Sequence, residues 1–338
     1  MTLEVGKFPA ALLEKILAKV DITDPRVVVG PRVGEDTAVL QTGGSLLVAK
    51  SDPVTFATDR IGWYAVQVNA NDVACTGGIP KWFLATLLVP ERFTEDEAEA
   101  VFDQILDACR SLNVSLVGGH SEVTYGIDRP IIMGTMLGEV EQDRLILTGG
   151  AQDGDSIVLT KGIAIEGTAL LARERPAALL QGGMTQGEID QAASLLSVPG
   201  ISVLNDARIA CASSQVHSMH DVTEGGLVTG LREVAKASGL GLAIEEGSVP
   251  ILPECQEVCR VLGLDPMGLL ASGALLITLP TPDVPGLLTA LEQEGIDGFE
   301  IGTMMDAAEG LQMVELHGET PLPEFSRDEL ARYMSASE

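Results

Sequence analysis

Five groups of polar residues, each next to small residues and apolar runs, are the parts of the chain that could do chemistry. They are Gly34-Glu35-Asp36, Ser51-Asp52-Pro53, Asn69-Ala70-Asn71-Asp72, Gly118-Gly119-His120-Ser121-Glu122 and His220-Asp221-Val222-Thr223-Glu224-Gly225-Gly226. Carboxylates at the ends of strands can converge on one cleft although they are far apart in the sequence. A triphosphate can share that cleft only if hard cations such as Mg²⁺ lie between the negative charges. The neighbouring glycines would let backbone N–H groups approach a phosphate.

Taken singly, each group has a simpler interpretation, because an Asp beside a Gly is most often a turn residue or a helix cap. The stretch 221–226 precedes an apolar run and is expected to begin a helix near Thr223. That helix N-terminus would also bind an anion. The common nucleotide motifs are absent, since no glycine-rich turn leads into Gly-Lys-Ser or Gly-Lys-Thr and Gly239-Leu240-Gly241 lacks a third glycine.

The elements that would position these residues alternate between helix and strand in both halves of the chain. The pattern of the first half predicts helices at 8–20, 62–75 and 94–112 and strands at 26–29, 37–40, 45–50, 82–89, 114–117 and 130–140. Helix 62–75 is expected to bury Trp63, Val66 and Val73. Thr94 and Glu97 form the capping-box pattern that opens the third helix.

The second half shows the same alternation after a glycine-rich stretch at 147–154. Its pattern predicts helices at 166–173, from 185, at 203–213, from 223, at 253–262 and at 284–294, and strands at 156–160, 216–219, 274–279 and near 299 and 312. We therefore expect a mixed α/β fold with two domains, at residues 1–148 and 149–338.

Composition excludes several classes of function. The chain has 338 residues, and 49 acidic against 21 basic side chains give a formal net charge of −28, which argues against nucleic-acid binding. Five cysteines are an odd number without a disulfide spacing, which indicates a reducing compartment. Residues 1–19 carry several charges and lack the apolar core of a signal peptide, and no run of about 18 apolar residues occurs. A cytoplasmic protein that binds no membrane is expected.

Other residues have competing interpretations. His217, His220 and His120 lack the paired spacing of a zinc site. Cys255 and Cys259 lie one helical turn apart, which suits core packing better than a redox or metal role. Cys75 adjoins Asn71-Asp72 and could line the same cleft. Lys161 follows a strand and could either reach a phosphate or remain solvated.

In this order, the five groups resemble the motifs of the PurM-like superfamily, which includes aminoimidazole-ribonucleotide synthetase, thiamine-monophosphate kinase, selenophosphate synthetase and the hydrogenase-maturation protein HypE. Gly34-Glu35-Asp36-Thr37-Ala38 and Ser51-Asp52-Pro53 resemble its two acidic motifs, and Asn71-Asp72-Val73-Ala74 resembles its Asn-Asp-Leu-Ala motif. His220 to Leu227 is similar to the second-domain motif of HypE. The match covers roughly residues 30–305 and is closest to HypE.

The resemblance implies an ATP- and Mg²⁺-dependent enzyme that passes the γ-phosphate to an oxygen of an amide, phosphate or similar acceptor. It also implies an N-terminal domain (residues 1–148) that binds nucleotide and dimerises through a shared barrel, and a companion C-terminal domain (residues 149–338). A protein partner in hydrogenase or other protein maturation is a further implication of the resemblance. The residues it assigns are Asp36, Asp52, Asp72, Glu122 and Asp221 to metal, Gly34, Asn71, Gly118, Gly119, Thr223, Gly225 and Gly226 to nucleotide, and Asp72 and His120 to catalysis.

The sequence departs from the family pattern at two places. His120 stands where relatives carry Asp or Glu, so that Glu122 is the expected substitute ligand. The last cysteine is Cys259, whereas HypE modifies a C-terminal cysteine of its own, so the same self-modification is not expected. Two alternatives therefore stay open: a non-catalytic nucleotide-binding assembly factor, and a small-molecule kinase like thiamine-monophosphate kinase.

Overall fold

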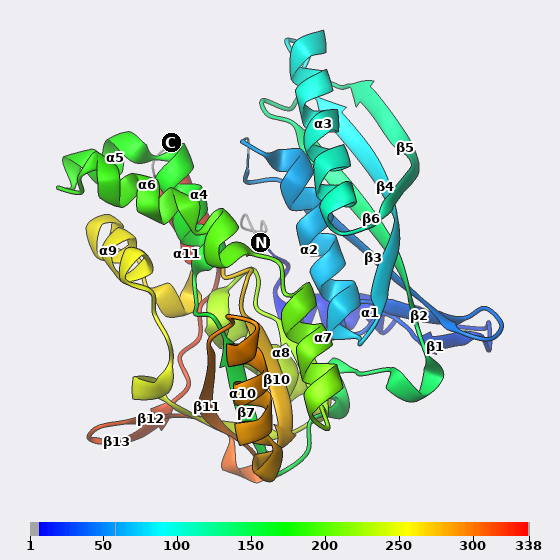
Figure 1. Cartoon of the computed structure of the whole chain (residues 1–338), viewed down its shortest axis with the longest axis vertical. Coiled ribbons are helices and arrows are strands. Elements are labelled where there is room, and N and C mark those ends of the chain that lie inside the picture. Colours follow the sequence, from blue (N-terminus) through cyan, green and yellow to red (C-terminus); the bar gives the residue numbers. More distant parts are fainter. Residues whose placement is uncertain (1–6, 58, 337–338) are drawn as a thin grey trace. The chain divides into compact units, whose positions relative to one another are not determined.

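The computed structural model describes residues 7–57 and 59–336. The chain divides into two compact units, a larger one of residues 1–21, 32–35 and 146–338 and a smaller one of residues 22–31 and 36–145. Each unit contains one mixed β-sheet with helices packed against it (Figure 1). The predicted mixed α/β fold class is confirmed.

The sheet of the smaller unit has six strands in the order β1-β2-β3-β6-β4-β5. The strands are β1 (Val27–Val29), β2 (Ala38–Gln41), β3 (Leu46–Val54), β4 (Ile79–Val89), β5 (Ser115–Val123) and β6 (Ile131–Val140). All neighbours are antiparallel except β4 and β5, which are parallel. Helices α2 (Ile61–Cys75) and α3 (Glu95–Ser111) connect these strands and lie together over one face of the sheet (Figure 1).

The local sequence explains several boundaries in this unit. Helix α3 begins with a capping box in which the Thr94 hydroxyl accepts from the Glu97 N–H, as the sequence predicts. Helix α2 is buried on nearly all sides and therefore carries no polar stripe. Gly119 is required where β5 approaches β4, because a Cβ there would lie 1.9 Å from the Ala85 carbonyl oxygen and its φ is +149°.

The sheet of the larger unit has seven strands in the order β13-β12-β9-β11-β7-β10-β8. They are β7 (Asp155–Thr160), β8 (Ser218–Asp221), β9 (Gly241–Glu245), β10 (Leu275–Pro280), β11 (Gly298–Met305), β12 (Leu311–Glu315) and β13 (Gly318–Pro321). Strand β10 lies between β7 and β8 and is antiparallel to both. Strand β7 lies inside the sheet and β8 at its edge, and both are buried throughout.

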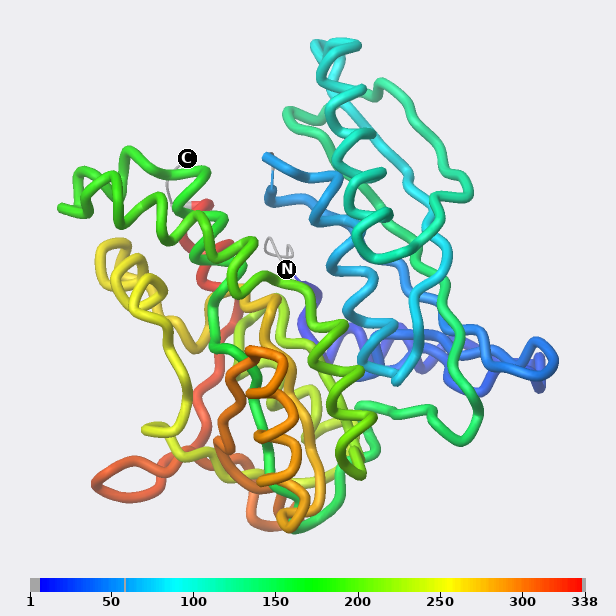
Figure 2. The backbone as a smooth tube through the Cα atoms, in the orientation of Figure 1, coloured from blue at the N-terminus to red at the C-terminus, as the bar shows by residue number. Residues whose placement is uncertain are grey.

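The described helices of this unit are α1 (Ala10–Leu17), α4 (Ile165–Glu174), α5 (Pro176–Gln181), α6 (Gln186–Ser194), α7 (Leu204–Ser213), α8 (Gly226–Ser238), α9 (Pro253–Leu262), α10 (Val284–Gln293) and α11 (Glu329–Ala336). Helix α8 packs Leu227, Val228 and Leu231 into the core on one face of the sheet. Helices α7 and α10 lie on the other face, and the backbone trace shows the same arrangement (Figures 1 and 2).

One stretch of the larger unit, Gln186–Ser213, is long and apolar enough to cross a membrane by length and composition alone. Its backbone is not a continuous helix, because Val198 has non-helical angles (φ −142°, ψ 111°) and Pro199 follows. Nearly half of its most apolar window is buried inside the protein. These features are those of core helices, so the stretch is weak evidence for a membrane span.

Several predicted boundaries are wrong, for identifiable reasons. Strand β3 continues to Val54 and β5 to Val123, so the polar groups at 51–53 and 118–122 lie inside strands rather than after them. Strand β2 pairs with β3 only as far as Ala49, so β6 is the strand that pairs with β3 at Pro53. A proline is tolerated there because one side of β3 has no strand partner at that position. Trp63 is only partly buried, while its neighbour Tyr64 is buried. Helix α8 begins at Gly226, not Thr223, and the sequence did not indicate α5, β9, β13 or α11.

Candidate functional site

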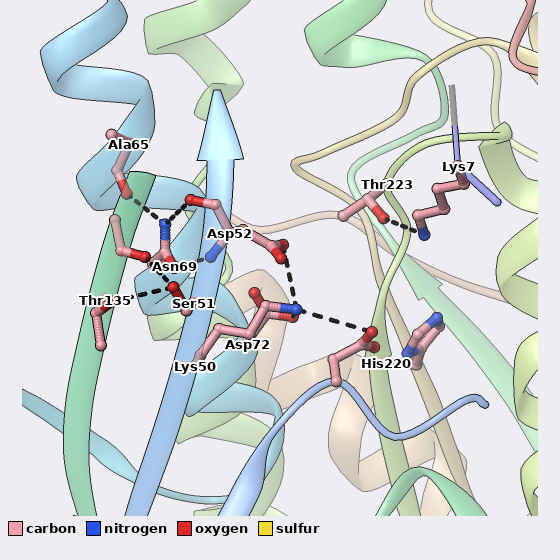
Figure 3. A network of polar contacts seen from close by, with 12 residues as sticks. Lys7, Lys50, Ser51, Asp52, Ala65, Asn69, Asp72, Thr135, His220 and Thr223 are labelled. Carbon is pink, nitrogen blue, oxygen red and sulfur yellow. Dashed lines mark hydrogen bonds and ion pairs between the residues drawn. The ribbon is translucent and has the colours of Figure 1, made fainter. Parts of the chain in front are cut away.

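Three of the predicted metal ligands converge on one lysine in the smaller unit. The Lys50 ammonium nitrogen lies 3.1 Å from Asp52 Oδ2, 3.2 Å from Asp72 Oδ1 and 3.8 Å from Asp36 Oδ1 (Figure 3). Lys50 and Asp52 are two residues apart on β3 and thus share a face of the strand. Asp72 comes from α2, and Asp36 lies just before β2. We call Asp36, Asp52 and Asp72 the acidic trio.

The trio is held by hydrogen bonds between β3 and α2. Asn69 Oδ1 accepts from the Asp52 N–H at 2.9 Å, and its Nδ2 donates to the Ala65 carbonyl at 2.9 Å (Figure 3). Gly134 on β6 leaves room for this amide, because a Cβ there would lie 2.4 Å from Asn69 Nδ2. Asn69 therefore holds the backbone of Asp52 in a fixed position against α2. The predicted nucleotide ligand Asn71 is completely buried in the same helix.

Burial differs between the side chains of the trio and Lys50. Lys50 and Asp72 have side chains only 8% and 5% exposed, whereas Asp36 and Asp52 are 33% and 43% exposed. Carboxylate oxygens are the donors that Mg²⁺ prefers. Among residues 7–57 and 59–336, however, no group of three or more His, Cys, Asp and Glu side chains could hold a metal ion as it stands. The trio fits a hard cation chemically, but the Lys50 ammonium lies among its oxygens.

The predicted residues of the group at 118–122 lie on β5, the edge strand of this sheet. His120 Nε2 lies 3.1 Å from Glu122 Oε2, and these two side chains are 64% and 49% exposed. Gly118 and Gly119 pair with Leu84 and Ala85 of β4. At Gly119, the close packing of β4 and β5 leaves no room for a side chain. The roles of these four residues towards ATP and metal stay predictions.

Gly34 and Glu35 belong to the larger unit. Gly34 has φ +90°, and a Cβ there would lie 2.9 Å from the Glu233 carbonyl oxygen and from Ala237 Cβ on α8. The buried Glu35 carboxylate accepts hydrogen bonds from the N–H groups of Thr148 and Gly149 at 3.4 and 3.0 Å. These contacts give both residues a packing role. A nucleotide-binding role for Gly34 stays a prediction.

The group at 220–226 forms the end of β8 and the turn into α8. The Thr223 carbonyl accepts from the N–H groups of Gly226 and Ala271 at 3.1 and 3.2 Å. Gly225 and Gly226 have φ of +88° and +68°, and a Cβ on Gly226 would lie 2.5 Å from the Met267 carbonyl oxygen. Glycine is therefore needed at both positions for the shape of the turn. We call residues 223–226 the glycine turn.

The sequence did not indicate the residue that holds the glycine turn. The Asp328 carboxylate, just before α11, accepts from the Gly225 N–H at 2.5 Å and the Leu330 N–H at 2.7 Å. The Gly226 N–H is also used, by Thr223. Two N–H groups that were expected to face an anion thus donate within the protein. The assignment of Gly225 and Gly226 to nucleotide binding stays a prediction.

A second acidic group lies at and beside the glycine turn. It is formed by Glu166 on α4, Asp221, Glu224 and Asp328. The pKa of Glu166 is raised to about 7, mainly by burial. A hydrogen bond with Ser272 lowers this pKa, whereas the charges of Asp328, Asp221 and Glu224 raise it. Burial also raises the pKa of Asp328 to about 7, opposed by its backbone hydrogen bonds to Gly225 and Leu330. We call these four residues the turn acids.

Basic side chains reach this region from the N-terminal segment and from β8. Lys7 Nζ lies 3.4 Å from Thr223 Oγ1 (Figure 3). It also lies 3.5 Å from Glu233 Oε1, and the Lys7 N–H donates to Glu224 at 3.0 Å. His220 Nε2 lies 3.0 Å from Glu233 Oε2. His220 thus pairs with a carboxylate, and Lys7 and Glu233 are further polar residues beside the turn that the sequence did not indicate.

Burial decides between the competing interpretations of Lys161 and of the pair Cys255 and Cys259. Lys161 is neither solvated nor directed at an open surface, because its ammonium donates to the Ser202 carbonyl at 2.6 Å and pairs with Asp206 at 3.1 Å, both side chains being at most 5% exposed. Cys255 and Cys259 are buried in α9, and burial raises the pKa of their thiols to about 11 and 12. These thiols therefore behave as core side chains.

Relatives match the chain over nearly its whole length. A putative hydrogenase expression/formation protein of Methanocaldococcus jannaschii is 26% identical over 94% of this chain and 96% of its own. Carbamoyl dehydratase HypE of Cupriavidus necator is 28% identical over 81% of this chain and 78% of its own.

Solved structures share the fold. Escherichia coli HypE, a hydrogenase maturation protein, superposes with a TM-score of 0.74 at 22% identity, over 96% of this chain and 98% of that one. A HypE structure in complex with ATP gives 0.67 at 22%, over 94% and 91%. A chain of a HypE–HypF complex gives 0.71 at 19%, over 93% and 100%.

Family models match both halves of the chain. The N-terminal domain of AIR synthase related proteins matches residues 34–140, and their C-terminal domain matches residues 152–313. The first match contains the acidic trio, and the second contains the glycine turn. This chain therefore belongs to the AIR synthase related, PurM-like family.

Proposed function

We propose that this protein is a magnesium- and ATP-dependent enzyme that transfers the γ-phosphate of ATP to an amide- or phosphate-type oxygen, in a hydrogenase or other protein maturation pathway. The observation that carries the proposal is the convergence of Asp36, Asp52 and Asp72 on a single point next to α2. Phosphoryl transfer depends mainly on positioning and on charge neutralisation, and a fixed set of carboxylates can hold the cations that this requires.

The names of the relatives support the choice of reaction. One relative is a carbamoyl dehydratase, and a structural neighbour was solved with ATP. Another neighbour was solved as a complex of HypE with HypF, which supports a protein partner for this chain as well. We include in the proposal a homodimer and a cytoplasmic location.

Each group has a defined task in this proposal. The acidic trio would hold Mg²⁺, which would neutralise charge on the β- and γ-phosphates. Asn69 keeps Asp52 in position, and Asn71 would orient the nucleotide. Asp221 and Glu122 would contribute further metal contacts, and His120 would act beside Asp72 in catalysis. Thr223 and the glycines at 34, 118, 119, 225 and 226 would border the nucleotide.

The first test measures nucleotide affinity. Asp72→Asn and Asp221→Asn are compared with wild type by calorimetric titration with ATP and Mg²⁺. Asp107→Asn serves as the matched control, because Asp107 is exposed and pairs with Arg110 on the surface of α3. We expect both site variants to lose at least tenfold in affinity while Asp107→Asn does not. Unchanged affinity in both site variants would refute the assignment.

The second test separates an enzyme from an assembly factor. ADP release is measured with protein carboxamides and with small phosphate esters, thiamine monophosphate among them, as acceptors. An enzyme turns ATP over faster with one acceptor, and Asp72→Asn abolishes that increase. ATP binding without turnover on any acceptor, together with a stable complex with another protein, would favour the non-catalytic alternative.

A further inference from the structure

Lys50 places a positive charge among the oxygens that the proposed function assigns to a metal ion. Its ammonium lies within 3.8 Å of all three members of the acidic trio, and its side chain is 8% exposed. A lysine is seldom buried unless a carboxylate accompanies it. Here three carboxylates accompany one ammonium. The trio and Lys50 together carry a formal charge of −2, which one divalent cation would balance.

A divalent ion and this ammonium compete for the same carboxylate oxygens. Mg²⁺ binds carboxylate oxygens at about 2.0–2.1 Å. The ammonium nitrogen is 3.1–3.2 Å from Asp52 and Asp72 oxygens, so an ion bound to these atoms would lie beside another cation. Repulsion between cations at such a separation is strong where water is excluded. Binding of a metal ion at these oxygens therefore favours a displaced Lys50 side chain.

We propose that Lys50 is the resident cation of the acidic trio and competes with a divalent ion for it. The proposal rests on the proposed function, which assigns the trio to Mg²⁺. It has two consequences. The nucleotide-free protein binds a divalent ion weakly, and the displaced ammonium becomes a donor for the anionic group that arrives with the metal. Lys50 thereby couples metal binding to nucleotide binding.

The test counts divalent ions on the nucleotide-free protein. Mn²⁺ binding is followed by electron paramagnetic resonance for wild type, Lys50→Met and Lys50→Arg. Lys50→Met removes the charge but keeps an apolar stem, and Lys50→Arg keeps the charge. We expect Lys50→Met to bind Mn²⁺ at least tenfold more tightly than wild type and Lys50→Arg to remain weak. Equal affinity in wild type and Lys50→Met, or no Mn²⁺ on folded Lys50→Met, would overturn the competition.

Folding of the variants is controlled separately. Thermal melting with and without Mn²⁺ shows whether Lys50→Met is folded, and Lys50→Gln is the second neutral variant. If neither folds, the wild type is labelled with ¹⁵N-lysine and titrated with Mg²⁺ and ATP. A change in the Lys50 ammonium signal on titration supports displacement, and an unchanged signal contradicts it.

The outcomes distinguish this inference from the proposed function. If wild type binds ATP with Mg²⁺ and Asp72→Asn does not, while Lys50→Met gains no affinity for Mn²⁺, the competition falls and the function stands. If wild type binds no ATP, the function falls. A gain of Mn²⁺ affinity in nucleotide-free Lys50→Met would still support the competition, because that measurement involves no nucleotide.

Discussion

The acidic trio of the smaller unit and the turn acids of the larger unit compensate their charge in different ways. In the trio, carboxylates up to 43% exposed share the Lys50 ammonium. Among the turn acids, Asp328 binds backbone N–H groups, and burial raises the pKa values of Glu166 and Asp328 to about 7. The first arrangement places carboxylate oxygens of three residues beside one ammonium group. The second fixes the conformation of the glycine turn, and two of its carboxyl groups have pKa values of about 7.

The largest expected effect follows from removing the cation of the trio. Lys50→Met leaves the buried Asp72 carboxylate without this partner, which costs about 3–5 kcal/mol in the free energy of unfolding. Urea unfolding at pH 7.5 without divalent ions measures it. The double variant Lys50→Met/Asp72→Asn should recover part of the loss. A loss below about 1 kcal/mol for Lys50→Met would mean that the lysine does not compensate these charges.

The next effect tests the backbone bonds of the turn acids. Asp328→Ala removes the acceptor of the Gly225 and Leu330 N–H groups and is expected to cost about 2–3 kcal/mol. Hydrogen exchange should accelerate at the Gly225 amide more than at amides of α3, in the other unit. If the Gly225 amide remains as protected as in wild type, Asp328 does not hold the glycine turn.

A smaller effect concerns pH. The folded-state pKa of Glu166 is about 7, above its ordinary value of 4.5, so the folded protein holds a proton that the unfolded chain has lost between these values. Stability from this group is therefore complete below about pH 4.5 and is lost as the pH rises to about 7. Glu166→Gln should remove this part of the slope, a difference of roughly 2 kcal/mol between pH 5 and 8.

Urea unfolding of wild type and Glu166→Gln from pH 4 to pH 8 checks this sign. Glu257→Gln is the control, because its exposed ion pair with Arg260 lowers the pKa of Glu257 rather than raising it. Parallel curves for wild type and Glu166→Gln would show that Glu166 ionises normally.

The smallest effect is expected at the exposed pair of β5. His120→Ala and Glu122→Gln should each change the free energy of unfolding by less than about 0.5 kcal/mol, since both side chains are largely exposed. The same variants then give a clean measure of their predicted roles, because any loss of ATP turnover cannot come from unfolding. A destabilisation above about 1 kcal/mol would show an additional contact for this pair.

Local patterns in the sequence predict much of this fold. The capping box at Thr94 predicts the start of α3, the helix expected from residue 185 is α6, and short apolar runs predict β4, β7 and β10. The predicted ends of β3 and β5 are less accurate, for a physical reason. Polar residues continue along both strands after their apolar runs end, and pairing with β6 or β4 decides their length.

The site was predictable only where its residues carry their own signal. Asp36, Asp52 and Asp72 stand in recognisable groups, and the structure brings them together. Lys50 lies two residues from Asp52 on the same strand, and this alternation could have indicated it. Asp328 could not be found in this way, because it meets Gly225 across 103 positions of the chain and depends on the packing of α11.

The most direct test of the account is the Mn²⁺ signal of the ATP-bound protein. Electron paramagnetic resonance of protein, ATP and Mn²⁺ is recorded for wild type and for Asp52→Asn, which alters the most exposed member of the trio and leaves Lys50 with Asp72. The account predicts protein-bound Mn²⁺–ATP in wild type and at least a tenfold weaker complex in Asp52→Asn. An identical complex in both proteins would place the metal elsewhere and contradict it.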